Sequence, residues 1–399
     1  MKIDPLTWME QGIRFVLFDS DMQGHGRERT MKRRDFIKLA GVSAALFPVV
    51  PSVFGQQVGQ PVIPPRRYTY RVTYKIDLPG DGKKARLWLP LPDTEDSPHQ
   101  FSQGSVWSGT ASTARFENVP GTTSPMFYAE WNRSGPRSVT VSSVIKTSDR
   151  AVNLGRYREG NSSALPADVK RYLQPTKFIP LDGIVRKTAL SITKEAKAQS
   201  QLQKARAIYD WVVENSYRDP ATRGCGRGNI KAMLETGHLG GKCADLNALF
   251  VGLARAAGIP ARDNYGIRID ESAAHKTLGQ ADDITTAQHC RPEFYLTGLG
   301  WVPVDPADVR QLALDEELPI EHPRVVELRE KLFGSWEMNW VAFNHGRDIR
   351  LARDSVLGEL PFFMYPQAEV GGHERDSLEP AEFAYKITSA RLVGTGIKF

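Results

Sequence analysis

The stretch GGKCADLNALF, residues 240–250, decides the fold, because it places a cysteine where a glycine turn becomes a helix. Apolar residues recur at helical spacing from Leu246 to Leu253, and Gly258-Ile259-Pro260 ends the pattern. This predicts an amphipathic helix with Cys243 in its first turn. Free amide groups and the positive helix end there favour thiolate over thiol. We therefore expect Cys243 to be a nucleophile, and a buried cysteine that begins a core helix is the competing interpretation.

A second informative stretch is QHCRPEFYLTGLGWVPVDP, residues 288–306. Its aromatic and β-branched residues predict two short strands around a glycine turn. A histidine, His289, opens this hairpin, and an aspartate, Asp305, closes it. A cysteine nucleophile needs a base to take its proton, and the base needs a carboxylate or amide to orient it. Cys243, His289 and Asp305 are therefore the candidate catalytic residues.

The predicted hairpin poses a geometric difficulty. If its centre lies between Gly298 and Leu299, Asp305 is opposite Pro292, and His289 then points to the other face of the pleat. Because a proline cannot donate a ladder hydrogen bond, we predict a β-bulge at or near this position that restores the parity.

The two stretches together resemble the core of the transglutaminase-like superfamily of papain-type thiol enzymes. The matching pieces are a Gly-Lys-Cys-x-Asp helix start, an alanine-rich helix ending at residues 256–262, and a His-to-Gly-Trp-to-Asp-Pro hairpin. The resemblance covers roughly residues 185–310 and departs at Cys290 and Arg291, where alanine and tryptophan are usual. It implies an α+β fold in which the helix that bears the cysteine packs on an antiparallel sheet, and a Cys-His-Asp triad.

The front of the chain predicts an export signal. The sequence MKRRDFIK at residues 31–38 is a twin-arginine signature, and a short apolar stretch follows at 39–50. That stretch is too short to span a bilayer stably. We expect residues 1–30 to be a non-native upstream segment and residues 31–55 to be a signal peptide. The mature protein is then periplasmic or otherwise extracytoplasmic, without stable membrane insertion.

The remaining chain divides by its hydrophobic pattern. Alternating segments separated by glycine, proline and serine at residues 66–148 predict an N-terminal β-sandwich-like domain. Polar residues 149–182 suit a linker, and residues 183–310 form the expected catalytic core. Residues 311–399 are expected to be a C-terminal extension packed on the core. Its expected elements are a helix at 325–333 and strands at 340–351, 362–365 and 383–392.

Composition limits the partners and cofactors. The chain has a net charge of +6 in 399 residues but no lysine-arginine stripe with interleaved aromatics, which argues against nucleic acid. Three cysteines are too few for a disulfide scaffold. Cys225 could pair with Cys290, or could approach Cys243 as a redox lock. With His238 and His289 the cysteines are zinc-ligand types, yet their spacing matches no zinc motif, so we predict neither metal nor cofactor.

The predicted function is thiol-dependent acyl transfer on peptide or carboxamide bonds, by a cysteine peptidase, an amidase or a transamidase. The expected partners are protein or peptide substrates, envelope peptides among them. The alternative is a catalytically silent module of the same fold that binds peptides or helps to assemble an envelope complex. The sequence leaves open the oligomeric state and whether water or an amine accepts the acyl group.

Overall fold

A computed structural model describes residues 66–79, 84–94, 97, 99–160 and 164–392. The expectations for residues 1–30 and for a signal at 31–55 fall outside these described residues. Within the described part of the chain, none of the helices has both the length and the apolarity needed to cross a bilayer.

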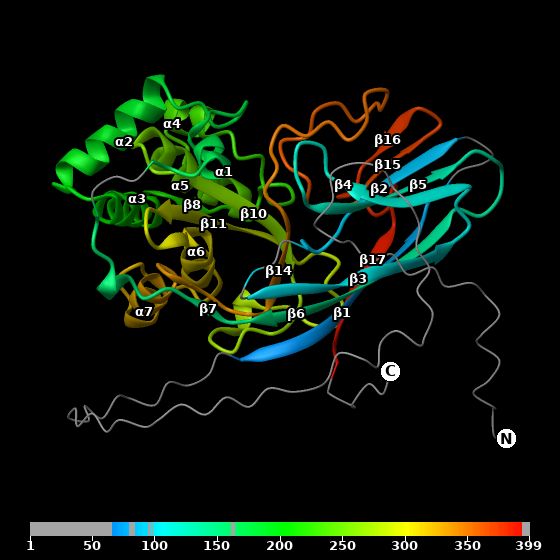
Figure 1. Ribbon diagram of the computed structural model, residues 1–399, viewed down its shortest axis with the longest axis horizontal. Coiled ribbons are helices and arrows are strands. Elements are labelled where there is room, and N and C mark those ends of the chain that lie inside the picture. The colour runs from blue at the N-terminus through cyan, green and yellow to red at the C-terminus, as the bar shows by residue number, and fades with distance from the viewer. Residues whose placement is uncertain (1–65, 80–83, 95–96, 98, 161–163, 393–399) are drawn as a thin grey trace, which may run out of the picture. The chain divides into compact units, whose positions relative to one another are not determined.

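Two antiparallel sheets make up a β-sandwich, seen beside the helices in Figure 1. The first sheet has the order β17-β1-β6-β3 and consists of β17 (Tyr385–Leu392), β1 (Arg67–Asp77), β6 (Ser138–Ser148) and β3 (Gln100–Gly109). The second sheet has the order β16-β15-β2-β5-β4 and consists of β16 (His373–Arg375), β15 (Gln367–Val370), β2 (Ala85–Pro90), β5 (Pro125–Trp131) and β4 (Thr113–Asn118). Alternate residues of β1, from Tyr70 to Ile76, are buried between the sheets, as a half-buried strand requires.

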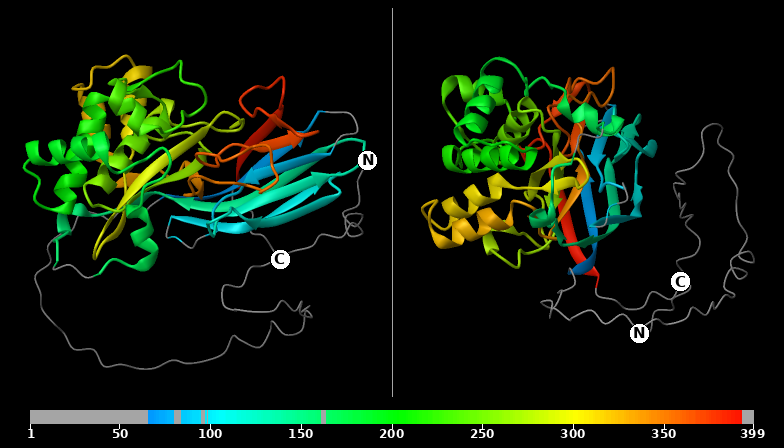
Figure 2. Two further views of the ribbon diagram at one scale, coloured as in Figure 1. Left: turned by 90° about the horizontal axis from the view of Figure 1, so that it is seen from above. Right: turned by 60° about the vertical axis from the view of Figure 1, so that its left-hand side comes forward.

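Only the last part of the C-terminal segment departs from the expectation that residues 311–399 pack on the catalytic core, because a helix at 323–331 and a strand at 340–344 do belong to that core. Its strands β15 and β17 pair with β2 and β1, so they complete the sandwich that the N-terminal strands begin. Figure 2 shows these late strands lying among the early ones in both views. Residues 362–365, expected to form a strand, have no regular structure; Phe362 and Met364 pack instead in the apolar cluster around Cys243, and Phe363 packs in a cluster with residues of the sandwich.

The catalytic region combines helices with a four-stranded antiparallel sheet of order β12-β11-β10-β14. The strands are β10 (Ala261–Arg268), β11 (Gln288–Leu296), β12 (Gly300–Pro303) and β14 (Trp340–Asn344). The helices are α2 (Gly183–Glu195), α3 (Gln201–Asn215), α4 (Ile230–Thr236), α5 (Cys243–Ala256), α6 (Pro306–Asp315) and α7 (Pro323–Lys331). Short elements connect them: β7 (Arg150–Ala151), α1 (Ala167–Lys170), β8 (Tyr217–Arg218), β9 (Gly240–Gly241) and β13 (Ser335–Trp336). The α+β prediction is confirmed.

Helix α5 is buried on every side, which corrects the expectation of an amphipathic helix. It packs against α2, α3, α4 and α6 and against strands β10 and β11. Its polar residues are buried with partners: the Arg255 guanidinium, for example, donates to the Ala261 carbonyl at 2.7 Å and to the Gln174 carbonyl at 2.9 Å. A central helix of this kind holds the residues at its N-terminus in fixed positions.

The centre of the β11–β12 hairpin lies half a residue earlier than expected, which shifts the strand register by one residue. Leu296 pairs with Gly300, so three residues form the loop and its centre is Gly298. Gly298 has a φ of 83°, a left-handed conformation that glycine adopts without strain. The three-residue loop therefore changes which residues of the two strands face each other.

This register removes the parity difficulty. With the centre at Gly298, Asp305 and His289 belong to the same face of the pleat. The pairing of β10 with β11 runs through Pro292 without a shift, and the Val304 amide donates to the Pro292 carbonyl at 3.0 Å. The predicted bulge at Pro292 is therefore wrong, because the turn itself supplies the correction.

Candidate active site

Cys243 is the first residue of α5 and is only 1% exposed. It lies in an apolar cluster built from the cysteine loop, the sheet and the C-terminal segment. The other members are Cys225, Ala244, Leu246, Tyr265, Cys290, Ala307, Phe362 and Met364, with Tyr365 packed against them. All three cysteines are free and buried, so neither of the two pairings considered from the sequence is present as a disulfide.

Asp245 fixes the loop that precedes the helix. Its Oδ1 accepts hydrogen bonds from the amides of Gly228 at 2.8 Å and Arg227 at 3.0 Å, and its Oδ2 accepts from the Lys242 amide at 3.2 Å. The backbone of Gly226 lies so close to the Asp245 carboxylate that a Cβ there would be 1.7 Å from Oδ2. Gly226 also has a φ of 88°, which favours glycine. The loop that carries Cys225 is thereby wrapped tightly around the start of α5.

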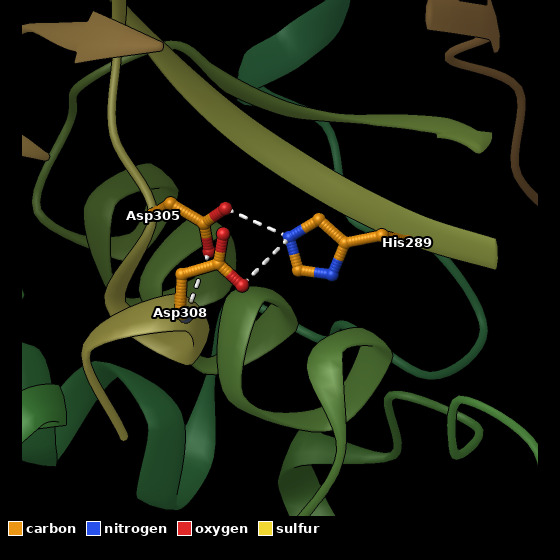
Figure 3. Close-up of side chains that lie close together, drawn as sticks. All are labelled: His289, Asp305 and Asp308. Carbon is orange, nitrogen blue, oxygen red and sulfur yellow. Dashed lines mark hydrogen bonds and ion pairs between the residues drawn. The ribbon is translucent and has the colours of Figure 1, made fainter. Parts of the chain in front are cut away.

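His289 and Asp305 form a buried hydrogen bond, with 2.8 Å between Nε2 and Oδ2 (Figure 3). His289 is the second residue of β11, and Asp305 caps α6 by accepting the Asp308 amide at 3.1 Å through Oδ1. The second ring nitrogen of His289, Nδ1, points away from the carboxylates in Figure 3. This leaves Nδ1 for the thiol of Cys243, which lies within interaction range of the imidazole.

The charges around His289 favour its protonated form. Burial and the Arg268 guanidinium work against the imidazolium, but the carboxylates of Asp308 and Asp305 outweigh them and raise the pKa of His289. Burial, followed by the neighbouring Asp308, raises the pKa of Asp305. The imidazole is therefore able to hold a proton taken from a nearby thiol.

The environment of Cys243 favours the thiolate. Hydrogen bonding from the Cys225 and Cys290 thiols and then contact with His289 lower the pKa of Cys243 well below its ordinary value, although burial opposes them. The same contact with Cys243, together with burial, raises the pKa of Cys225. Burial raises the pKa of Cys290. The directions of these pKa shifts favour Cys243, rather than Cys225 or Cys290, as the thiolate.

Four further residues support this arrangement, and the sequence interpretation missed their roles. Asn247, one turn after Cys243, donates to the Cys290 carbonyl at 2.8 Å and accepts from the Ala307 amide at 3.2 Å. The others are Asp308, Arg268 and Arg291, which are all buried near His289. The only signal in the sequence was the helical spacing of Asn247 from Cys243 and the strand spacing of Arg291 from His289.

A metal ion fits this cluster poorly. His289, Asp305 and Asp308 bring three ligand atoms within 4.8 Å of one another. Guanidinium groups already occupy the carboxylates, however: Arg268 lies 2.5 Å from Asp308, and Arg291 lies 3.5 Å from Asp305. The acidic charge is therefore balanced by arginine rather than available to a cation.

A separate polar cavity of about 430 Å³ lies against the sheet, where Glu293 accepts from Arg150 and Arg262 at 2.6 Å each. Trp301 and Trp336 also line it, and none of the three candidate catalytic residues does.

Comparison with known proteins identifies the family. The model of the transglutaminase-like superfamily core matches residues 186–306, the segment that holds all three candidate residues. An uncharacterised protein of Haemophilus influenzae is 38% identical over 343 residues, which cover 82% of this chain and 91% of that protein. The chain belongs to the transglutaminase-like superfamily.

One solved structure has a similar fold over most of the chain, and a second aligns only weakly. A protein of Cytophaga hutchinsonii described as a "putative cysteine protease" aligns with a TM-score of 0.51 and 15% identity, covering 82% of this chain and 92% of that one. The periplasmic domain of TgpA from Pseudomonas aeruginosa aligns with a TM-score of 0.30 and 16% identity, over 65% of this chain and 92% of that one. The first similarity extends the shared fold beyond the superfamily core to most of the described chain.

Proposed function

We propose that this protein is a thiol-dependent acyl transferase or hydrolase that acts on peptide or carboxamide bonds through Cys243, His289 and Asp305. The observation that supports it most is the constellation itself. A cysteine at a helix N-terminus faces an imidazole whose Nε2 is held 2.8 Å from a buried carboxylate.

The chemistry follows from the roles of the three groups. The Cys243 thiolate attacks the substrate carbonyl, and the His289 imidazolium protonates the leaving amine as the tetrahedral intermediate collapses to a thioester. The imidazole then removes a proton from water or from a primary amine, which attacks the thioester and expels the Cys243 thiolate, so the thiolate–imidazolium pair is restored. Asp305 holds the ring and its tautomer throughout.

The Cys243 amide is suited to bind the oxyanion. The next amide, that of Ala244, already donates to the Cys225 carbonyl at 2.9 Å, and those of Asp245 and Leu246 donate to the Lys242 carbonyl at 3.0 Å each. Within the described chain, no acceptor is found for the Cys243 amide. A substrate oxygen beside the sulfur can therefore take this donor at the positive end of α5.

Hydrolysis is the reaction we propose in preference to crosslinking, with peptide or isopeptide bonds of envelope proteins or peptides as substrates. The twin-arginine pattern at residues 31–38 places the protein outside the cytoplasm in this proposal. There, water is far more concentrated than any amine. Peptide libraries incubated with and without a primary amine, and analysed by mass spectrometry, test this: cleaved products support hydrolysis, and amine adducts in their place contradict it.

Alkylation across pH tests the nucleophile without knowledge of the substrate. Iodoacetamide labelling, with each cysteine assigned by peptide mass spectrometry, should modify Cys243 well below the usual thiol pKa. His289→Ala should abolish this low-pH reactivity. Cys290→Ser provides a control that keeps the imidazole. If Cys243 reacts no faster at low pH than Cys225, the proposal fails.

The low exposure of Cys243 favours one alternative, a silent peptide-binding module. A thiol that is 1% exposed and belongs to the same apolar cluster as Phe362 and Met364 also suits a purely structural role. The same labelling experiment separates the two functions. A structural thiol stays inert in the native protein and in His289→Ala alike.

A further inference from the structure

Two carboxylates, rather than one, approach the same nitrogen of His289. Nε2 lies 2.8 Å from Oδ2 of Asp305 and 3.3 Å from Oδ1 of Asp308, as Figure 3 shows. All three side chains are almost fully buried, with exposures of 2% or less. In a site without bulk water, a charge at this distance acts on the ring with little screening.

Arg268 on β10 holds Asp308 in this place. Its Nη2 lies 2.5 Å from Oδ1 of Asp308, and its Nη1 lies 3.3 Å from Oδ2. The guanidinium is itself anchored, because Nη1 also donates to the Leu278 carbonyl at 2.6 Å. Oδ1 of Asp308 therefore contacts both the Arg268 guanidinium and Nε2 of His289. An ion pair between Asp308 and Arg268 alone would not require Oδ1 to lie so close to the His289 ring.

The charged groups that face His289 balance one another. Asp305 precedes α6, Asp308 lies on it, Arg268 comes from β10 and Arg291 from β11. Two carboxylates and two guanidiniums sum to zero, and transfer of a proton from Cys243 on α5 to the ring keeps the total unchanged. With a single carboxylate the same cluster would carry a net positive charge both before and after that proton transfer, and this charge would oppose a protonated ring.

We propose that Asp308 is a second positioning carboxylate for His289, which acts with Asp305 on one ring nitrogen and stabilises the thiolate–imidazolium pair. This inference rests on the proposed function in one respect: the thiolate–imidazolium pair has a catalytic use only if Cys243 is the nucleophile. Asp308 touches neither the sulfur nor the site of the substrate carbonyl in this arrangement, so its effect passes through the ring.

The test measures the ring directly. In full-length protein with Cys243→Ala, which removes coupling to the thiol, NMR titration of the histidine Cε1–H signals gives the pKa of His289, and His289→Gln assigns its signal. Adding Asp308→Asn should lower that pKa by about one unit. Glu369→Gln is the matched control, since it breaks another buried arginine pair, with Arg86 in the sandwich, and should leave the pKa of His289 unchanged.

Arg268→Gln provides a second arm with the opposite sign. It removes a positive charge that opposes the imidazolium, so the pKa of His289 should rise. If Asp308→Asn does not fold, this arm decides, and an unchanged or lowered pKa overturns the proposal. An unchanged pKa in folded Asp308→Asn, or an equal shift in Glu369→Gln, also overturns it. Because neither arm requires Cys243 to react, failure here is distinct from failure of the proposed function, which alkylation tests.

Discussion

Asn247→Ala should destabilise the protein strongly, because one side chain joins three elements of the site. The Asn247 Nδ2 donates to the Cys290 carbonyl on β11 at 2.8 Å, and its Oδ1 accepts from the Ala307 amide of α6 at 3.2 Å. Asn247 is fully buried, so both partners lose a bond that water cannot replace. A buried polar group left without a partner costs roughly 1–3 kcal/mol, which gives about 2–6 kcal/mol for the two together.

Urea unfolding followed by tryptophan fluorescence measures this loss. The midpoint should fall markedly while the denaturant slope stays constant, because the surface exposed on unfolding is unchanged. Asn264→Ala is the matched control. Asn264 is also buried, on β10 next to β11, but among the described residues its Nδ2 is found to donate to one acceptor, the Arg291 carbonyl at 3.2 Å. It should cost about 1–2 kcal/mol. If Asn247→Ala unfolds at the same urea concentration as the wild type or as Asn264→Ala, the reasoning is refuted.

Three more outcomes are expected. Burial lowers the pKa of His345 to about 3, whereas its value in the unfolded chain is about 6.5. The free energy of unfolding should therefore fall as the pH drops from 6.5 towards 3. Urea unfolding at a series of pH values should show a smaller dependence of this free energy on pH in His345→Gln. Gly226→Ala should lower the melting temperature more than Gly258→Ala, since both have positive φ but only the first meets a side chain; equal shifts would contradict this. Phe362→Ala should speed iodoacetamide modification of Cys243 by thinning its cover, and an unchanged rate would show that this ring does not limit access.

The identity of the candidate residues could be predicted from the sequence because it depends on side-chain chemistry and local pattern. Cys243 follows a glycine turn, and His289 and Asp305 frame a hairpin of aromatic and β-branched residues. The structure brings these three together. The register of the hairpin was less predictable, since it depends on whether the loop has two, three or four residues, and Gly298 and Gly300 permit several turn types.

The supporting residues could not be predicted from local pattern. Arg268 meets Asp308 across 40 positions of sequence, and Asn247 meets Ala307 across 60. A buried arginine or asparagine looks like a surface residue until the fold shows what surrounds it. The same limit explains why residues 362–365 were expected to form a strand: their apolar run is equally compatible with irregular packing over Cys243.

The pairing of the first strand with the last has a consequence for biogenesis. Thr69 lies opposite Leu392, more than 300 positions later, so β1 gains this neighbour only after residues up to Leu392 have left the ribosome. Until then the hydrogen-bonding groups along one side of β1 stay open, and such long-range closure is slow. A nascent or truncated chain that ends before Tyr385 therefore presents an unpaired strand edge to other chains. We expect chaperones that bind extended segments to protect this edge until Tyr385–Leu392 pairs with it.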